Sequence, residues 1–303
     1  MGVSLSSGYN QSGHSFEWNE KFLSNASLET HLRQLAISTH LGLSDIRFPD
    51  KFLSSGMSFP ALESLFIHGL NFHKNPEFPH FPRLRYLTFC NLSFRDVPVD
   101  TRRLEILSTD FPSLEELRLL SVGTTVTVDQ ACLEGLKRLD LSGDDALAFL
   151  RDENKPSHLD YIKHIRIDPA GDDADPAIFL KFPRYLERLD LIVYFPFIPI
   201  EAPDPQILHD FHARFMIATE NCEALRVLNI YCVSHGTEDL TTFNEAMNAI
   251  KGCCEAKGVR CHLKNSKDSW VNIPLAYQLD DPEGSMRYFQ SVFPNLCVQC
   301  LTY

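Results

Sequence analysis

Residues 111–120 read FPSLEELRLL, and they combine the two patterns from which the fold class is predicted. It joins Phe-Pro to the pattern L-x-x-L-x-L, in which Leu, Ile or Phe fills the apolar positions. The second half of the pattern alternates apolar and polar residues with period two, which predicts a short strand with one buried face. Proline fixes φ and has no N–H to donate, so Pro112 suits the entry to that strand. The stretch therefore predicts a turn followed by a half-buried strand.

The same apolar pattern recurs eight times along the chain, at intervals of 22 to 39 residues. One such unit cannot bury its apolar edge alone, so we expect successive units to stack and their strands to form one parallel sheet. The alternative is a chance recurrence in an ordinary Leu-rich α/β domain. The motifs begin at Leu32, Leu62, Leu84, Leu114, Leu136, Ile162, Leu186 and Leu225.

Phe-Pro also recurs before the motif. It stands at Phe59 and Phe81 as it does at Phe111, and at Phe182 with one inserted residue, Tyr185. A further Phe-Pro at Phe293 predicts a ninth unit. The joint recurrence of both patterns favours a repeat architecture over chance.

Between the strands the chain has to return along the outer side of the sheet. Apolar residues at helical spacing predict helices over residues 204–221, 144–151 and 241–257. Gly258 follows the last of these where a C-terminal glycine is expected. Alternation over residues 259–263 predicts another strand, and the other returns are too short or too Pro-rich for much helix.

Here the residues resemble a known family. The chain is similar to leucine-rich-repeat proteins, and its Phe-Pro-x-Leu units resemble the repeat region of fungal F-box proteins. The resemblance implies a solenoid, in which a curved parallel β-sheet carries helices and irregular returns on its convex side. The chain departs from the family pattern directly after the strands. The usual Asn or Cys is replaced there by Leu70, Leu92, Val122 and Val233. No F-box-like segment is found before the first repeat, and in that family this segment docks the chain onto a ubiquitin-ligase adaptor.

The predicted organisation has three parts. Residues 1–27 are expected to be a flexible N-terminal segment or cap, residues 28–264 the leucine-rich-repeat domain, and residues 265–303 a C-terminal cap or further repeat. Gly2 with Ser6 fits the myristoylation pattern, and a solvated Gly/Ser tail is the alternative.

Composition narrows the class of partner and compartment. The formal net charge of −12 does not suit nucleic acid as a partner. The longest apolar run, residues 191–200, has ten residues, whereas a spanning helix needs about twenty, so no membrane span is expected. No secretory signal is found, and the nine cysteines are odd in number and scattered. We expect a cytoplasmic or nuclear protein.

No motif points to a cofactor or a metal. Phosphate-binding loops, dinucleotide fingerprints, nucleophile elbows and zinc-protease motifs are not found. Cys253, Cys254 and Cys261 fall at inward positions and are interpreted as small buried hydrophobes. Three other groups could ligate a metal but lack a full ligand set, and we expect no metal at any of them. These groups are Cys297 with Cys300, His209 with His212, and Asp172, Asp173 and Asp175.

The third, fifth and seventh motif positions are expected to face outward on the concave side of the sheet. In the early motifs this face is aromatic and neutral, and in the middle it carries alternating charges. Neighbouring charges could neutralise one another and fix the register, or could form a recognition stripe, since exposed aromatic residues and Arg are frequent at interface hot spots. The predicted binding residues are Phe66, His68, Tyr86, Glu116, Arg118, Arg138, Asp140, His164, Arg166, Arg188, Asp190, Asn229 and Tyr231.

The sequence therefore predicts a non-catalytic protein-protein interaction module that binds a partner on its concave face. The resemblance adds substrate recognition for a cullin-type ubiquitin ligase, with an adaptor as partner if an F-box is supplied elsewhere. Two alternatives stay open. One is a truncated paralogue without a ligase role, and the other is a hydrolase in which His164, Asp140 and Asp168 supply the titratable groups.

Overall fold

The computed structural model of the chain contains two compact units. Unit 1 comprises residues 1–136 and 274–303, and unit 2 comprises residues 137–273, so the predicted repeat segment 28–264 is shared between them. Both units are built mainly from parallel strands with few helices, which confirms the predicted α/β class with a parallel sheet. The structure describes residues 2–7, 31–39, 59–143, 158–168, 182–194, 222–233 and 241–265.

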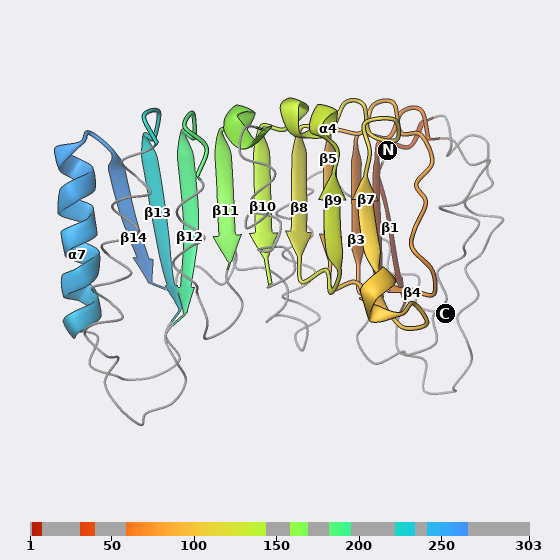
Figure 1. Cartoon of the computed structure of the whole chain (residues 1–303), viewed down its shortest axis with the longest axis horizontal. Helices are drawn as coiled ribbons and strands as arrows, with labels where there is room; N and C mark the ends of the chain where they lie inside the picture. Colours follow the sequence, from red (N-terminus) through yellow and green to blue (C-terminus); the bar gives the residue numbers. More distant parts are fainter. Residues whose placement is uncertain are drawn as a thin grey trace, which may run out of the picture. The chain divides into compact units, whose positions relative to one another are not determined.

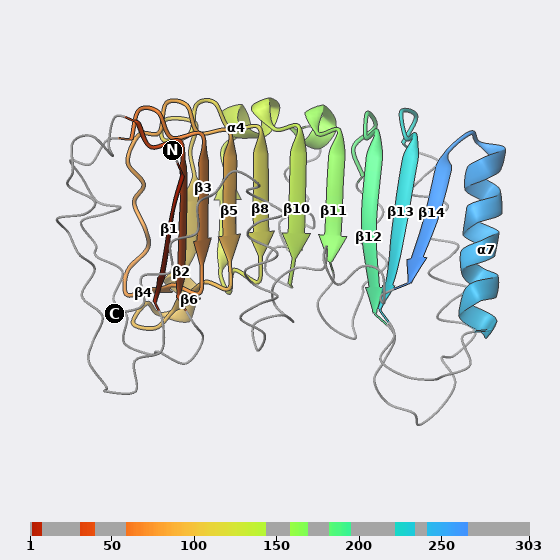
Figure 2. The same cartoon turned by 180° about the vertical axis from the view of Figure 1, so that it is seen from behind.

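Among the described residues of unit 1, five main strands pair in parallel in the order β1-β2-β3-β5-β8 (Figures 1 and 2). The first of them lies within the predicted N-terminal segment, where it pairs with the strand of the first motif. These strands are β1 (Gly2–Ser7), β2 (Gln34–Thr39), β3 (Ser64–His68), β5 (Tyr86–Cys90) and β8 (Glu116–Leu120).

The described part of unit 2 likewise contains five parallel strands in the order β10-β11-β12-β13-β14 (Figure 2). Each strand that carries a motif begins at the third motif position, as in unit 1, so the motifs mark the strands as predicted. The strands are β10 (Arg138–Ser142), β11 (His164–Asp168), β12 (Arg188–Tyr194), β13 (Val227–Val233) and β14 (Arg260–Asn265).

The Phe-Pro dipeptides form the turns that lead into the strands. The amide of Leu84 donates to the carbonyl oxygen of Phe81 at 3.3 Å, and the equivalent bonds join Leu114 to Phe111 and Leu62 to Phe59. Proline thus occupies the second position of a four-residue turn, where its fixed φ is favoured. At the fourth Phe-Pro the inserted Tyr185 moves this turn along by one residue, so that the amide of Leu186 donates to Pro183.

The phenylalanines of these turns stack on one another in unit 1. Phe81 lies between Phe59 and Phe111, with ring centroids 6.4 Å and 5.8 Å apart and the rings nearly parallel. All three side chains are buried. Stacked rings fill the space between successive turns and add to the energy of burial.

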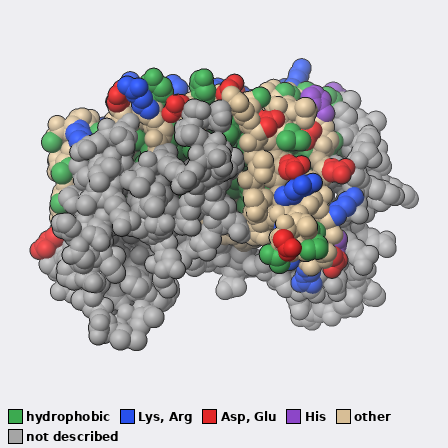
Figure 3. Space-filling model, in the orientation of Figure 1, with side chains coloured by type: hydrophobic (Ala, Val, Ile, Leu, Met, Phe, Trp, Pro, Cys, Tyr) green, Lys and Arg blue, Asp and Glu red, His purple; other side chains and the backbone are tan. Residues whose placement is uncertain are grey.

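The returns of unit 1 contain short strands where the resemblance implies helices or irregular chain. They form two small parallel pairs, and β7 and β9 lie over one face of the main strands of this unit (Figures 1 and 2). Leu104 and Val126 are buried beneath this pair, while acidic and basic side chains mix on its outer side (Figure 3). The elements are β4 (Asn71–Phe72), β6 (Ser93–Phe94), the 3-10 helix η1 (Val99–Thr101), β7 (Arg103–Ile106) and β9 (Thr125–Val128).

The chain bends sharply where the main strands end. The eighth motif position has a positive φ at Gly69, Asn91, Ser121 and Gly143, which permits that bend. The next residue then points inward, and Leu70, Leu92 and Val122 are buried there. Apolar packing therefore occupies the position where the resembling family carries Asn or Cys.

Helix α4 (Gln130–Gly135) was not predicted from the sequence. Its N-cap is Asp129, whose carboxylate accepts hydrogen bonds from the amide of Cys132 at 2.7 Å and from the amide of Ser108 at 2.6 Å. These bonds outweigh the effect of burial and lower the pKa of Asp129 below its usual range. The cap thereby ties the start of α4 to the turn that follows β7.

Helix α7 (Thr241–Ala256) confirms the prediction for residues 241–257. Gly258 has a φ of +73°, as expected for a residue that ends a helix, and the amide of Val259 returns to the carbonyl oxygen of Cys254 at 2.8 Å. The following strand β14 matches the prediction for residues 259–263. Cys254 and Cys261 are buried as expected, whereas Cys253 is only half-buried, contrary to the prediction. A second 3-10 helix, η2 (His158–Tyr161), precedes β11.

Several predictions concern residues outside the described ranges. They are the helices over residues 144–151 and 204–221, the unit at Phe293, and the C-terminal segment beyond Asn265.

Candidate functional site

The polar face of each unit is defined here by the third, fifth and seventh motif positions. The fourth and sixth positions bury their side chains on the opposite face, as Leu139 and Leu141 do in β10. In unit 2 the strands are in register, so Arg138, His164 and Arg188 lie in one row across β10, β11 and β12. The polar face of unit 2 therefore brings together residues 50 positions apart in the sequence.

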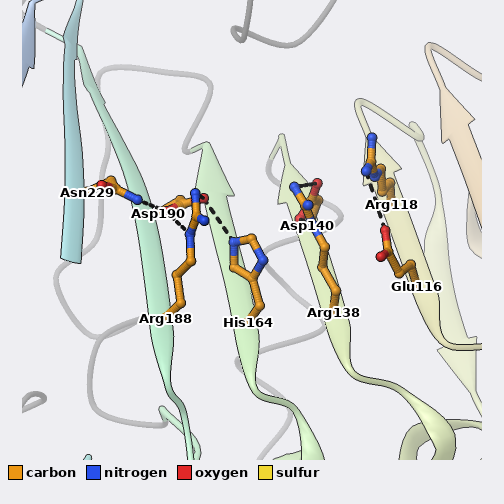
Figure 4. A network of polar contacts seen from close by, with 8 residues as sticks. All are labelled: Glu116, Arg118, Arg138, Asp140, His164, Arg188, Asp190 and Asn229. Carbon is orange, nitrogen blue, oxygen red and sulfur yellow. Dashed lines mark hydrogen bonds and ion pairs between the residues drawn. The ribbon is translucent and has the colours of Figure 1, made fainter. Parts of the chain in front are cut away.

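Two of these strands share the tetrapeptide RLDL and the same ion pair. Arg138 extends along β10 to Asp140, with Nε 2.8 Å from Oδ1 and Nη2 2.9 Å from Oδ2. Arg188 makes the same two-pronged contact with Asp190 on β12, with both distances 2.9 Å (Figure 4). Paired N–H···O bonds between a guanidinium and a carboxylate are strong and fix the direction of the side chain.

Asp190 is the centre of this network. Besides Arg188, its carboxylate accepts hydrogen bonds from Nε2 of His164 at 2.9 Å and from Nδ2 of Asn229 at 2.5 Å (Figure 4). Asp190 is only 3% exposed. Burial by itself would raise its pKa, but the hydrogen bonds from His164, Arg188 and Asn229 outweigh it and hold the pKa well below the usual range. An ionised carboxylate only accepts, so Nε2 of His164 carries the proton.

Arg166 occupies the middle of the network. In the register of the sheet it lies between Asp140 on one neighbouring strand and Asp190 on the other. Its guanidinium carbon is also 6.0 Å from the centre of the Tyr231 ring, which is a cation–π distance. The alternation of charge predicted for the fifth position is thus present across β10, β11 and β12.

The polar face of unit 1 is less charged. Glu116 and Arg118 stand two residues apart on β8, with Nη2 of the arginine 3.4 Å from a carboxylate oxygen. Tyr86 on β5 is half-buried, and Arg85 lies 5.3 Å from the centre of its ring. The rings of Phe66 and His68 lie 6.3 Å apart on β3.

The expectation that this face is open is wrong for six of the predicted residues. All six stand at the fifth or seventh motif position, and their side chains are buried. Tyr86, Glu116, Arg118, Arg138, His164 and Arg166 are half-buried, and Arg188 is exposed. Whether these residues bind a partner is not decided by their exposure and stays a prediction. The six buried residues are Phe66, His68, Asp140, Asp190, Asn229 and Tyr231.

Sequence reasoning missed a second line of charges at the second motif position. There Lys163 donates to Glu187 at 2.9 Å, and Arg85 makes a two-pronged contact with Glu115. Arg33 and Glu63 form an ion pair, with Nη1 3.8 Å from Oε1. The signal was visible in the sequence, because basic and acidic residues alternate at this position from motif to motif, except where Lys163 follows Lys137.

The hydrolase alternative stays a prediction. His164 donates to Asp190, which was not among its three groups, and the side chain of Asp168 lies outside the described part. Among the described residues no group of three His, Cys, Asp or Glu side chains could hold a metal ion. The other candidate ligands fall outside the described ranges. They are His209, His212, Cys297, Cys300, Asp172, Asp173 and Asp175.

Comparison with known proteins gives no further guidance. Neither a protein-family model, nor a curated protein, nor a solved structure matches this chain.

In the described ranges, no helix has the length and apolar character needed to cross a bilayer.

Proposed function

We propose that the chain is a leucine-rich-repeat solenoid that acts as a non-catalytic protein-interaction module. Its binding site is the third-position row of unit 2, which runs from Arg138 through His164 and Arg188 to Val227. The row continues to Arg260, the residue of β14 that is in register with Val227. These five residues are in register on five successive strands. Repeat sheets present such rows to protein partners.

The observation that carries the proposal is that the side chain of Arg188 is both exposed and held in place. Its side chain is 46% exposed, yet two hydrogen bonds hold it against Asp190. Ordering a long side chain on binding costs roughly 0.5–1.5 kcal/mol, and an arginine that is already held avoids much of this cost. An exposed and ordered arginine is a common hot-spot residue at protein interfaces.

Site-specific photo-crosslinking tests this function. A photoreactive amino acid replaces Val227, which stands in the row but outside the ion-pair network, and the protein is irradiated in a native extract. We expect the crosslink to capture a distinct protein, which mass spectrometry identifies. The same amino acid at Ala249, an exposed position of α7, is the control. Equal products from both positions, or no specific product from Val227, would contradict the proposal.

The ubiquitin-ligase role is a narrower part of this proposal and depends on the resemblance to fungal F-box proteins. It predicts that a cullin-type ligase co-purifies with the chain from native cells. Purification of the partner without any cullin would remove this role and leave the interaction module in place.

A further inference from the structure

We infer that the third-position row of unit 2 recognises an acidic segment in the polyproline II conformation, with a carboxylate at every third residue. This inference rests on the proposed function, since it names the chemistry of the partner for the same row.

The charge of the polar face of unit 2 is opposite to that of the whole chain. At the third and fifth positions of β10 to β13 and at the residues of β14 in register with them, four arginines stand against two aspartates, which leaves two positive charges with the histidines neutral. The chain as a whole carries −12. A partner that binds this row gains most from negative charge, while most of the remaining protein repels it. The arginines are Arg138, Arg166, Arg188 and Arg260, and the aspartates are Asp140 and Asp190.

Donors remain for a carboxylate at the exposed end of the row. Arg188 uses Nε and Nη2 toward Asp190, and within the described residues its Nη1 makes no hydrogen bond. A carboxylate can therefore contact the Nη1 end of this guanidinium without displacing Asp190. Arg260 is exposed and forms no ion pair in the described part of the chain.

The spacing of the row matches the repeat of a polyproline II segment. Arg138, Arg188 and Arg260 are each separated by one intervening strand, and neighbouring strands lie about 4.8 Å apart, so successive arginines are about 10 Å apart. A polyproline II helix rises about 3.1 Å per residue with three residues per turn. Side chains three residues apart therefore lie on one face at about 9 Å. In a β-strand, residues three apart point to opposite faces.

The positions between the arginines agree with this spacing. His164 and Val227 occupy the intervening strands, and both are half-buried. His164 offers an imidazole ring and Val227 a small apolar surface. Both lie beneath the residues of the bound segment that separate its carboxylates. A proline-rich segment supplies apolar groups there and has little conformational entropy left to lose.

Fluorescence anisotropy with labelled nonapeptides tests the inference. The probe is three repeats of Glu-Pro-Pro. The controls are three repeats of Gln-Pro-Pro, which remove the charge, and Glu-Glu-Glu followed by six prolines, which keeps the charge and changes the spacing. We expect the probe to bind at least tenfold more tightly than either control. Equal binding of the probe and either control would overturn the inference.

Variants locate the binding on the row. Arg260→Gln removes one charge without touching the Asp190 network, and we expect it to weaken binding of the probe about fivefold. Arg226→Gln is the matched control, because Arg226 is exposed in the same unit but stands at the second motif position. Equal effects of both variants would overturn the inference.

The two proposals fail separately. A specific crosslink from Val227 without binding of the Glu-Pro-Pro probe refutes the acidic segment alone and leaves the interaction module standing. Binding of the probe that Arg260→Gln weakens and Arg226→Gln does not supports the acidic segment, whatever protein is captured.

Discussion

At the scale of single residues, one buried carboxylate organises the polar face of unit 2. Asp190 accepts from a guanidinium, an imidazole and an amide that come from three neighbouring strands. A buried charge is tolerated only when its hydrogen bonds are made, so removal of the charge leaves three donors poorly matched.

Asp190→Asn is therefore expected to lower the free energy of unfolding by about 2–4 kcal/mol, measured by urea denaturation at pH 7. The substitution preserves the size of the side chain, so no cavity contributes. Glu223→Gln serves as the control, because it removes a carboxylate that is 62% exposed and paired with Arg184, and its loss is expected to stay below about 1 kcal/mol. Equal losses for both variants would show that the network does not stabilise the fold.

The same carboxylate predicts how stability depends on pH. The pKa of Asp190 is lower in the folded chain than in the unfolded chain, so its contribution is fully present above the unfolded value of about 3.9. That contribution is lost as the pH falls from there toward the folded value, because the unfolded chain binds the proton first. The difference in unfolding free energy between wild type and Asp190→Asn should thus shrink as the pH falls below 4. A difference that does not change with pH would contradict the depressed pKa.

At the scale of elements, two glycines with different roles allow a test of the backbone. Gly252 lies within α7, is exposed, and would have open space around an added Cβ. Gly123 has a φ of +66°, and an added Cβ would lie 3.0 Å from the carbonyl oxygen of Leu92.

Gly252→Ala is expected to raise the free energy of unfolding by about 0.5–1 kcal/mol, because alanine favours a helix and restricts the unfolded chain. Gly123→Ala is expected to lower it by about 1–3 kcal/mol, since the left-handed backbone becomes strained and the added Cβ collides with a main-chain oxygen. Thermal and urea unfolding measure both. A loss of stability in Gly252→Ala would argue against a helix at this position.

The phenylalanine stack supplies a second test at this scale. Phe81→Ala removes the central ring of the stack of Phe59, Phe81 and Phe111, and we expect a loss of about 3–5 kcal/mol in unfolding free energy. Val99→Ala changes a side chain that is 73% exposed and should stay within about 0.5 kcal/mol of wild type. A similar small change in Phe81→Ala would mean that the rings do not pack as the structure has them.

The elements also show how far sequence reasoning reaches. Period-two alternation located the motif strands, and helical spacing with a following glycine located α7, because burial of an apolar face leaves a local periodic signal. The β7–β9 pair left only four-residue segments, and α4 has only six residues, so neither is long enough to leave a periodic signal that separates it from loop. The partners of Asp190 follow from the register once the strands are aligned, but the burial of Phe66 and Tyr231 depends on tertiary packing that no local pattern records.

Across the described chain, the burial of the cysteine thiols indicates how tightly the protein is packed. Six cysteine side chains are described, and none of them forms a disulfide. Burial raises the pKa of Cys222 to about 11 and that of Cys132 to about 12. The thiolate is the reactive form, so both thiols should be unreactive in the folded chain at neutral or mildly alkaline pH.

Alkylation with iodoacetamide at pH 8, followed by mass spectrometry, checks this expectation. Cys132 and Cys222 should react at least tenfold more slowly in the native protein than in urea. The half-buried Cys253 should show a smaller difference between the two rates. Native rates for Cys132 and Cys222 that match the rates in urea would show that these packed regions open readily.

The RLDL strands have a consequence for how such a chain can grow. Because Arg138 and Asp140 belong to one strand, as do Arg188 and Asp190, each of these strands brings its own counter-charge. Duplicating or deleting a whole strand of this kind leaves no lone ion behind in the interior. His164 lacks this independence, since its acceptor belongs to the next strand. Gene duplication can therefore copy a single RLDL strand without its neighbours. The strand of His164 has to be copied together with β12, which carries its acceptor Asp190.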